Sequence, residues 1–233
     1  MKQAEIVIIG GGPAGLCAAV SAAKSGSKVL IIDKNKKLGG QLIKQTHMFF
    51  GSEKQYASKR GIDIPEILID ELYKYKENVE ISTEATVVGM YEDGIITVLE
   101  KEDNYYKIEP KAVVVATGAY EKFLSFPNND LPGIYGAGAV QTLMNVYGIK
   151  PGTRVLMVGA GNIGLIVSYQ LMQAGVEVKA ILDAAPKIGG YLVHASKIRR
   201  MGVPILTSHT VKEAIGNEFL EKAVICKVDE KFN

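Results

Sequence analysis

The sequence has few cysteines, no long apolar run and almost no net charge. Its only cysteines, Cys17 and Cys226, lie far apart, in neither a Cys-x-x-Cys nor a metal-ligand spacing. This excludes a disulfide scaffold, predicts no metal site and is typical of the reducing cytoplasm. No apolar run approaches the roughly 20 residues that span a bilayer. A net charge of +2 in 233 residues argues against a nucleic-acid binder with a basic face. We therefore expect a soluble, cytoplasmic protein with neither a membrane span nor a nucleic-acid partner.

Two glycine-rich turns of the same form are present instead. The first is Gly10-Gly11-Gly12-Pro13-Ala14-Gly15 and the second is Gly159-Ala160-Gly161-Asn162-Ile163-Gly164. Each follows an apolar run, opens a helix-like stretch and is followed by a second apolar run that ends in an acid. These acids, Asp33 and Asp183, lie 23 and 24 positions after the first glycine of their turns. A dinucleotide-binding βαβ unit has roughly 20. The pattern predicts two dinucleotide sites.

The chemistry of such a unit explains the residue types. The first glycine permits the tight turn, the second lets the backbone approach a diphosphate, and the third lets the helix pack closely on the strand. Amide groups at the helix start then hold the diphosphate, and the acid accepts hydrogen bonds from ribose hydroxyls. Two structural turns that bind nothing remain the alternative.

The rest of the chain repeats one architecture. Strand, helix and strand are expected at 4–9, 15–25 and 28–32, followed by a helix at 63–76, hairpins at 85–109 and a buried strand from Lys111. A strand–helix–strand unit at 154–182, a helix at 191–201 and a hairpin repeat that order. We predict an α/β fold with two Rossmann-like dinucleotide-binding domains, each with a parallel sheet plus a β-meander. The predicted boundaries are 1–120, a connecting segment 121–150, and an incomplete domain 151–233.

The whole chain resembles the two-dinucleotide-binding flavoproteins of the pyridine nucleotide–disulfide oxidoreductase family. The resemblance implies that domain 1–120 binds FAD and that domain 151–233 binds NAD(H). The residues carried over for FAD are Gly10, Gly12, Pro13, Ala14, Gly15, Asp33, Lys34, Gly40, Gln41, Thr46, Val87, Ala116, Thr117 and Gly118. Those for NAD(H) are Gly159, Gly161, Asn162, Ile163, Gly164 and Asp183.

Two departures from the family pattern refine this expectation. Disulfide reductases of the family carry a cysteine pair, but stretches 44–50 and 137–141 hold none, and we expect Cys17 to be buried and inert. The chain instead resembles a cysteine-free branch that includes α-type subunits of sarcosine and opine oxidases, dye-linked proline dehydrogenase and hydrogen cyanide synthase. That branch implies partner subunits and substrates such as an amine, an amino acid or glycerol 3-phosphate.

The second departure is the end of the chain. The family's first domain is completed by a returning segment with a Gly-Asp motif, and nothing after Val176 resembles it. We expect either a truncated chain or a separate chain that supplies the segment. FAD would then be bound loosely or not at all.

Few other side chains suggest chemistry. His47 is the only histidine near the expected flavin edge and is the candidate catalytic residue, although a loop histidine without a chemical role is the alternative. Asp183 favours NAD over NADP, because a carboxylate repels a 2′-phosphate. Lys187, four residues on, weakens that inference slightly.

The predicted function is that of an FAD-dependent oxidoreductase subunit which transfers hydride between NAD(H) and flavin. Electrons would pass to or from a partner subunit or a small-molecule substrate, and a homo-oligomer is possible. A non-catalytic dinucleotide-binding or assembly subunit is the alternative. A flavin monooxygenase fits the paired hairpins less well.

Overall fold

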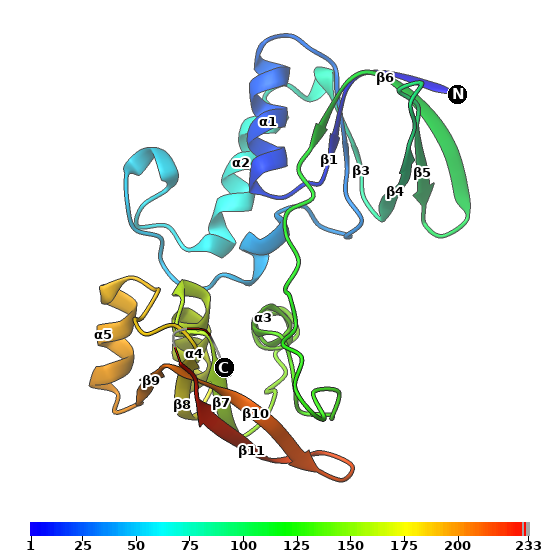
Figure 1. Ribbon diagram of the computed structural model, residues 1–233. Coiled ribbons are helices and arrows are strands. Elements are labelled where there is room, and N and C mark those ends of the chain that lie inside the picture. The colour runs from blue at the N-terminus through cyan, green and yellow to red at the C-terminus, as the bar shows by residue number, and fades with distance from the viewer. Residues whose placement is uncertain (230, 232–233) are drawn as a thin grey trace. The chain divides into compact units, whose positions relative to one another are not determined.

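The structure is a computed structural model that describes residues 1–229 and 231. The chain divides into two compact units, Met1–Tyr120 and Glu121–Asn233, and most of their helices and strands are labelled in Figure 1. Among the described residues, no helix is long and apolar enough to cross a membrane.

The first unit is a mixed six-stranded sheet with helices on one face. Its main elements are β1 (Lys2–Ile9), α1 (Pro13–Lys24), β2 (Val29–Ile32), α2 (Ile64–Tyr73), β3 (Val79–Ser82), β4 (Ala85–Met90), β5 (Ile96–Glu100) and β6 (Asn104–Val115). Short 3₁₀ turns lie at η1 (Gly40–Lys44), η2 (Glu53–Gln55), η3 (Gly61–Asp63) and η4 (Lys76–Asn78). The strand order is β3-β2-β1-β6-β5-β4. The first four strands pair in parallel, and β4, β5 and β6 pair antiparallel.

Both faces of this sheet are covered by apolar side chains. Ile8 packs in one cluster with Leu16 of α1 and Leu68 of α2, and the two helices lie side by side in Figure 1. On the other face, Val7 packs with Ile96 and neighbouring residues of β5. The central strands are therefore apolar on both sides, as expected of a buried parallel sheet.

Two sequence expectations in this unit are wrong. The β6 strand runs unbroken from Asn104 to Val115, so the last strand of the expected hairpins and the strand expected from Lys111 are one element. Pro110 lies beyond Ile108, the last partner of β5, where its missing N–H breaks no bond to that strand. As a result, the meander is joined to the parallel sheet through β6, and its strand β5 packs over the Val7 face of that sheet. Cys17 is exposed, because α1 buries its Leu16 and Ala19 face.

The second unit has a parallel three-stranded sheet and a separate hairpin. Its elements are α3 (Ala137–Asn145), β7 (Arg154–Val158), α4 (Asn162–Gln173), β8 (Glu177–Asp183), α5 (Leu192–Arg200), β9 (Ile205–Thr207), β10 (His209–Gly216) and β11 (Leu220–Lys227). Strands β7, β8 and β9 pair in that order, and β10 pairs with β11. Apolar residues of β7, β8, α3, α4 and α5 form one core cluster. A buried hydrogen bond of 3.0 Å from Gln141 Nε2 to Gln170 Oε1 joins α3 to α4.

Candidate dinucleotide sites

The first glycine turn connects the carboxyl end of β1 to the start of α1. Gly10 has φ +105°, and its amide donates to the Ile32 carbonyl over 2.8 Å. A Cβ at Gly10 would lie 2.4 Å from the Ala116 oxygen. A Cβ at Gly15 would lie only 1.8 Å from the Gly10 oxygen. Glycine is therefore required at both positions by the protein itself.

Gly12 differs from these two glycines because neither its backbone conformation nor its neighbours in the protein require glycine. Its φ of −75° suits any residue, and the nearest atom to a Cβ there would be the Gly40 Cα at 3.8 Å. Gly12 is the N-cap of α1, and no side chain caps this helix start. Open space beside uncapped amides is what an approaching diphosphate requires.

The second glycine turn reproduces this geometry between β7 and α4. Gly159 has φ +104° and donates to the Leu182 carbonyl over 2.7 Å. A Cβ at Gly164 would lie 1.9 Å from the Gly159 oxygen, whereas one at Gly161 would meet nothing within 4 Å. The Gly161 N-cap has φ −74° and ψ 177° and no side-chain cap, against −75° and −175° at Gly12. The two turns therefore have the same backbone geometry.

The acids that follow the second strands hold these turns in place. Asp33 is 6% exposed. Its Oδ2 accepts from the Gly11 amide over 2.6 Å, and its Oδ1 accepts from the amide and side chain of Asn35 over 2.7 and 2.9 Å. Within the described part of the chain, Asp183 accepts only from the amides of Ala160 (2.7 Å) and Ala185 (2.9 Å). A carboxylate has about four lone-pair sites. The Asp183 carboxylate therefore has about two lone-pair sites left for further donors.

A second pair of glycines lies against each turn, Gly39-Gly40 in the first unit and Gly189-Gly190 in the second. Of these four residues, only Gly40 is among the site residues predicted from the sequence. The Gly39 amide donates to the Gly11 carbonyl over 2.7 Å, and the Gly190 amide donates to the Ala160 carbonyl over 2.9 Å. The signal was present in the sequence. Stretches 33–42 and 183–192 share Asp, Lys, Gly-Gly and Leu at the same spacing.

The two sites differ in how closed they are. Strand β1 has β2 on one side and β6 on the other, so Gly10 is covered by Ala116, whose amide donates to the Ile9 carbonyl. Among the described residues of the second unit, β7 pairs with β8 alone. A Cβ at Gly159 would accordingly meet nothing within 4 Å among the described residues.

Several residues predicted for FAD lie on neighbouring segments. Pro13 and Ala14 are exposed in the first turn of α1, and Thr117 and Gly118 are exposed after β6. The others, also outside the glycine turn, are exposed Lys34 after β2, exposed Gln41 in η1, half-buried Thr46 after η1, and Val87, which pairs with Val98 in β4 and β5.

Two histidines and the first two residues of α4 lie in different surroundings. The half-buried His47 ring stacks on Phe49, with centroids 5.3 Å apart and planes 26° apart. Burial, and then the nearby Lys197 charge, lower the pKa of His194 from its ordinary value of 6.5, which favours a neutral imidazole at pH 7. Ile163 is 51% exposed, while Asn162 Oδ1 accepts from the Tyr191 amide over 2.7 Å.

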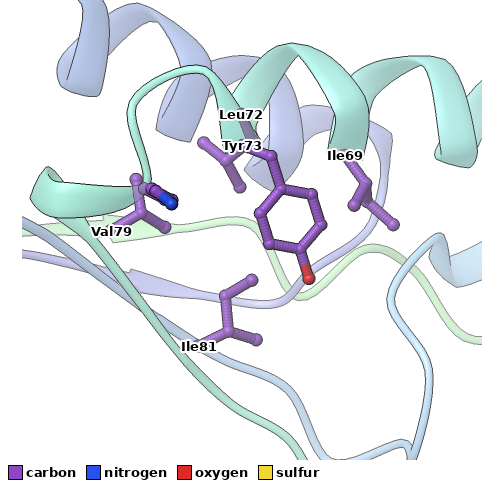
Figure 2. Close-up of a pocket in the computed structure, with 6 residues that line it drawn as sticks. Ile69, Leu72, Tyr73, Val79 and Ile81 are labelled. Carbon is purple, nitrogen blue, oxygen red and sulfur yellow. The ribbon is translucent and has the colours of Figure 1, made fainter.

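A small pocket lies beside the carboxyl-terminal half of α2 (Figure 2), and none of the residues that line it belongs to the glycine turn. Its lining is mainly apolar and includes Ile69, Leu72, Tyr73, Val79 and Ile81. With a volume of about 30 Å³ it has room for little more than one water molecule, so it is too small for a dinucleotide. Within residues 1–229 and 231, no group of three or more His, Cys, Asp or Glu is placed to hold a metal ion.

The fold and the paired glycine turns are those of dinucleotide-binding α/β domains. Residues 4–233 match the family model of the pyridine nucleotide-disulphide oxidoreductases. The chain belongs to that family, whose members typically bind FAD and NAD(P). The resemblance deduced from the sequence is thereby confirmed.

Two curated relatives of the chain are named as subunits of oxidases. The alpha subunit of sarcosine oxidase from Rhizobium meliloti (strain 1021) is 30% identical over 198 residues, which cover 79% of this chain and 19% of that protein. An opine oxidase subunit from Agrobacterium tumefaciens (strain Ach5) is 30% identical over 202 residues, which cover 82% and 39%. The chain therefore spans only about a fifth to two-fifths of the length of these relatives.

Solved structures agree with this placement. The L-proline dehydrogenase from P. horikoshii superimposes with a TM-score of 0.68 at 25% identity, over 99% of this chain and 40% of that one. The thioredoxin reductase of T. acidophilum gives a TM-score of 0.75 at 22% identity, over 97% and 71%. The second match supports the fold alone.

Proposed function

We propose that the first unit binds FAD and the second binds NAD(H), as parts of an oxidoreductase that exchanges hydride between them. The observation that carries the proposal is the duplicated turn. Each copy leaves room for a Cβ at its second glycine, Gly12 or Gly161, beside an uncapped helix start. A bound flavin would supply the hydride chemistry, and the protein would bind and orient both cofactors.

The residues at each turn have distinct roles in this proposal. Amides at the starts of α1 and α4 receive the two diphosphates. Asp33 holds the first turn through the Gly11 amide, and Asp183 both holds the second turn and binds the ribose diol. His47, oriented by its stacking on Phe49, is the proposed proton relay at the flavin edge.

Disulfide reduction is not part of the proposal. Cys17 is the only cysteine of the first unit and Cys226 is the only one of the second, so neither unit has a cysteine pair of its own. Relatives named as subunits of sarcosine and opine oxidases support an amine or amino acid as the substrate, and a partner subunit that shares in its oxidation.

The visible absorption spectrum of the purified protein tests this function. A yellow protein whose flavin bands bleach on addition of NADH is expected. A protein bleached by an amino acid or a polyol phosphate, but not by NADH, would reassign the electron donor. A colourless protein that binds NAD⁺ would favour a non-catalytic assembly subunit over a flavoenzyme.

Asp183→Ala is expected to weaken NAD⁺ binding by about ten- to a hundredfold, since hydrogen bonds to a charged group contribute about 1.5–3 kcal/mol. The preference of the wild-type protein for NAD⁺ over NADP⁺ should shrink as well, because the repelling carboxylate is gone. Isothermal titration with both nucleotides measures the two effects. Asp130→Ala, at an exposed position of the same unit, is the matched control. Unchanged NAD⁺ affinity in Asp183→Ala would exclude the ribose role.

A further inference from the structure

Segment 189–191 is attached to the second glycine turn by two hydrogen bonds. The Gly190 amide donates to the Ala160 carbonyl over 2.9 Å, and the Tyr191 amide donates to Asn162 Oδ1 over 2.7 Å. The segment also touches the turn directly. A Cβ at Gly190 would lie 2.5 Å from Leu165 Cδ1 and 3.0 Å from the Gly161 carbonyl carbon, so any larger residue would press against the turn.

The Asn162 bond brings two helix starts together. Asn162 is the first residue of α4, and Tyr191 is the N-cap of α5, which has no side-chain cap of its own. The Asn162 side chain therefore links the start of α4 to the start of α5 through one hydrogen bond. The first amides of each helix have no acceptor within the helix, and both helices direct the positive end of their dipole to this place.

The first unit lacks this arrangement. Pro13 stands at the first position of α1 and has no side-chain acceptor. The Gly39 pair is held there by its backbone bond to Gly11. The element that follows, η1, is a 3₁₀ turn of five residues rather than an α-helix.

We propose that Asn162 is a positioning residue, which holds the start of α5 beside that of α4 so that amides of both helices receive the diphosphate of the dinucleotide. This inference rests on the proposed NAD(H) site of the second unit. Segment 189–191 would then line that site together with the glycine turn 159–164.

Asn162→Ala tests the role through two readouts on the whole chain. Hydrogen exchange of the Tyr191 amide should become about tenfold faster without NAD⁺, and the Kd for NAD⁺ should rise about tenfold, because one hydrogen bond is lost. Asn162→Asp keeps an acceptor for the Tyr191 amide but places a negative charge beside the diphosphate. It should retain slow exchange and still bind NAD⁺ about tenfold more weakly. Asn217→Ala, an exposed asparagine of the same unit, should change neither value.

The outcomes separate this inference from the function on which it rests. A wild-type protein that does not bind NAD⁺ overturns both. If the wild-type protein binds NAD⁺ and Asn162→Ala binds it within about twofold, the positioning role alone is wrong. The role is also wrong if affinity falls in Asn162→Ala with no change in Tyr191 exchange, or if Asn162→Asp binds as tightly as wild type.

Discussion

Gly12→Ala is expected to lower FAD affinity by about a hundredfold and to leave the fold intact. The new methyl group meets no atom of the protein closer than 3.8 Å and needs no unusual φ, so the free energy of unfolding should fall by no more than about 1 kcal/mol, the cost of alanine at an N-cap. It would instead project toward the diphosphate, where overpacking costs about 1–3 kcal/mol. Titration with FAD and thermal unfolding of the ligand-free protein measure the two quantities.

Gly161→Ala is the matched control for this prediction. A Cβ there meets nothing within 4 Å, so this variant should also fold normally, keep its FAD affinity and lose affinity for NAD⁺ by a similar factor. If Gly12→Ala binds FAD as the wild-type protein does, the open space at Gly12 is not a diphosphate site.

Gly164→Ala is expected to destabilise the second unit by about 3 kcal/mol, at the upper end of the usual cost of overpacking. Its Cβ would lie 1.9 Å from the Gly159 oxygen and 3.0 Å from the Gly159 carbonyl carbon. Both atoms are backbone, so no flexible side chain can move aside, and α4 must shift away from β7. Calorimetric unfolding of the ligand-free protein measures the loss.

Gly152→Ala serves as the control for this loss. Gly152 is in the same unit, has open space at its Cβ position and is not at positive φ. The melting temperature of the Gly152→Ala variant should therefore stay near that of the wild-type protein. Equal melting temperatures for Gly164→Ala and Gly152→Ala would show that the close helix–strand contact does not stabilise the unit.

The glycine turns and their strand–helix–strand units could be predicted from the sequence because local constraints determine them. A positive φ at Gly10 and Gly159, and a contact that excludes any Cβ at Gly15 and Gly164, leave one residue type at each position. The apolar run of β2 is buried along its whole length, so the residues predicted to form the strand are also core residues.

Other features depend on contacts that a single sequence does not display. Pro110 favours a break between two strands, yet β6 continues because β1 pairs along it from Ile108 to Val115. The spacing of Asp183 indicates a ribose ligand, but only the structure shows its bond to the Ala160 amide. The same holds for Asn162, whose bond to Tyr191 spans 29 positions.

Native mass spectrometry of the protein with FAD and NAD⁺ tests the central claim most directly, because it counts each ligand per chain. The account predicts one FAD and one NAD⁺ on the wild-type chain, loss of FAD alone in Gly12→Ala, and loss of NAD⁺ alone in Gly161→Ala. A wild-type chain that takes up neither dinucleotide, or variants that keep both, would contradict it.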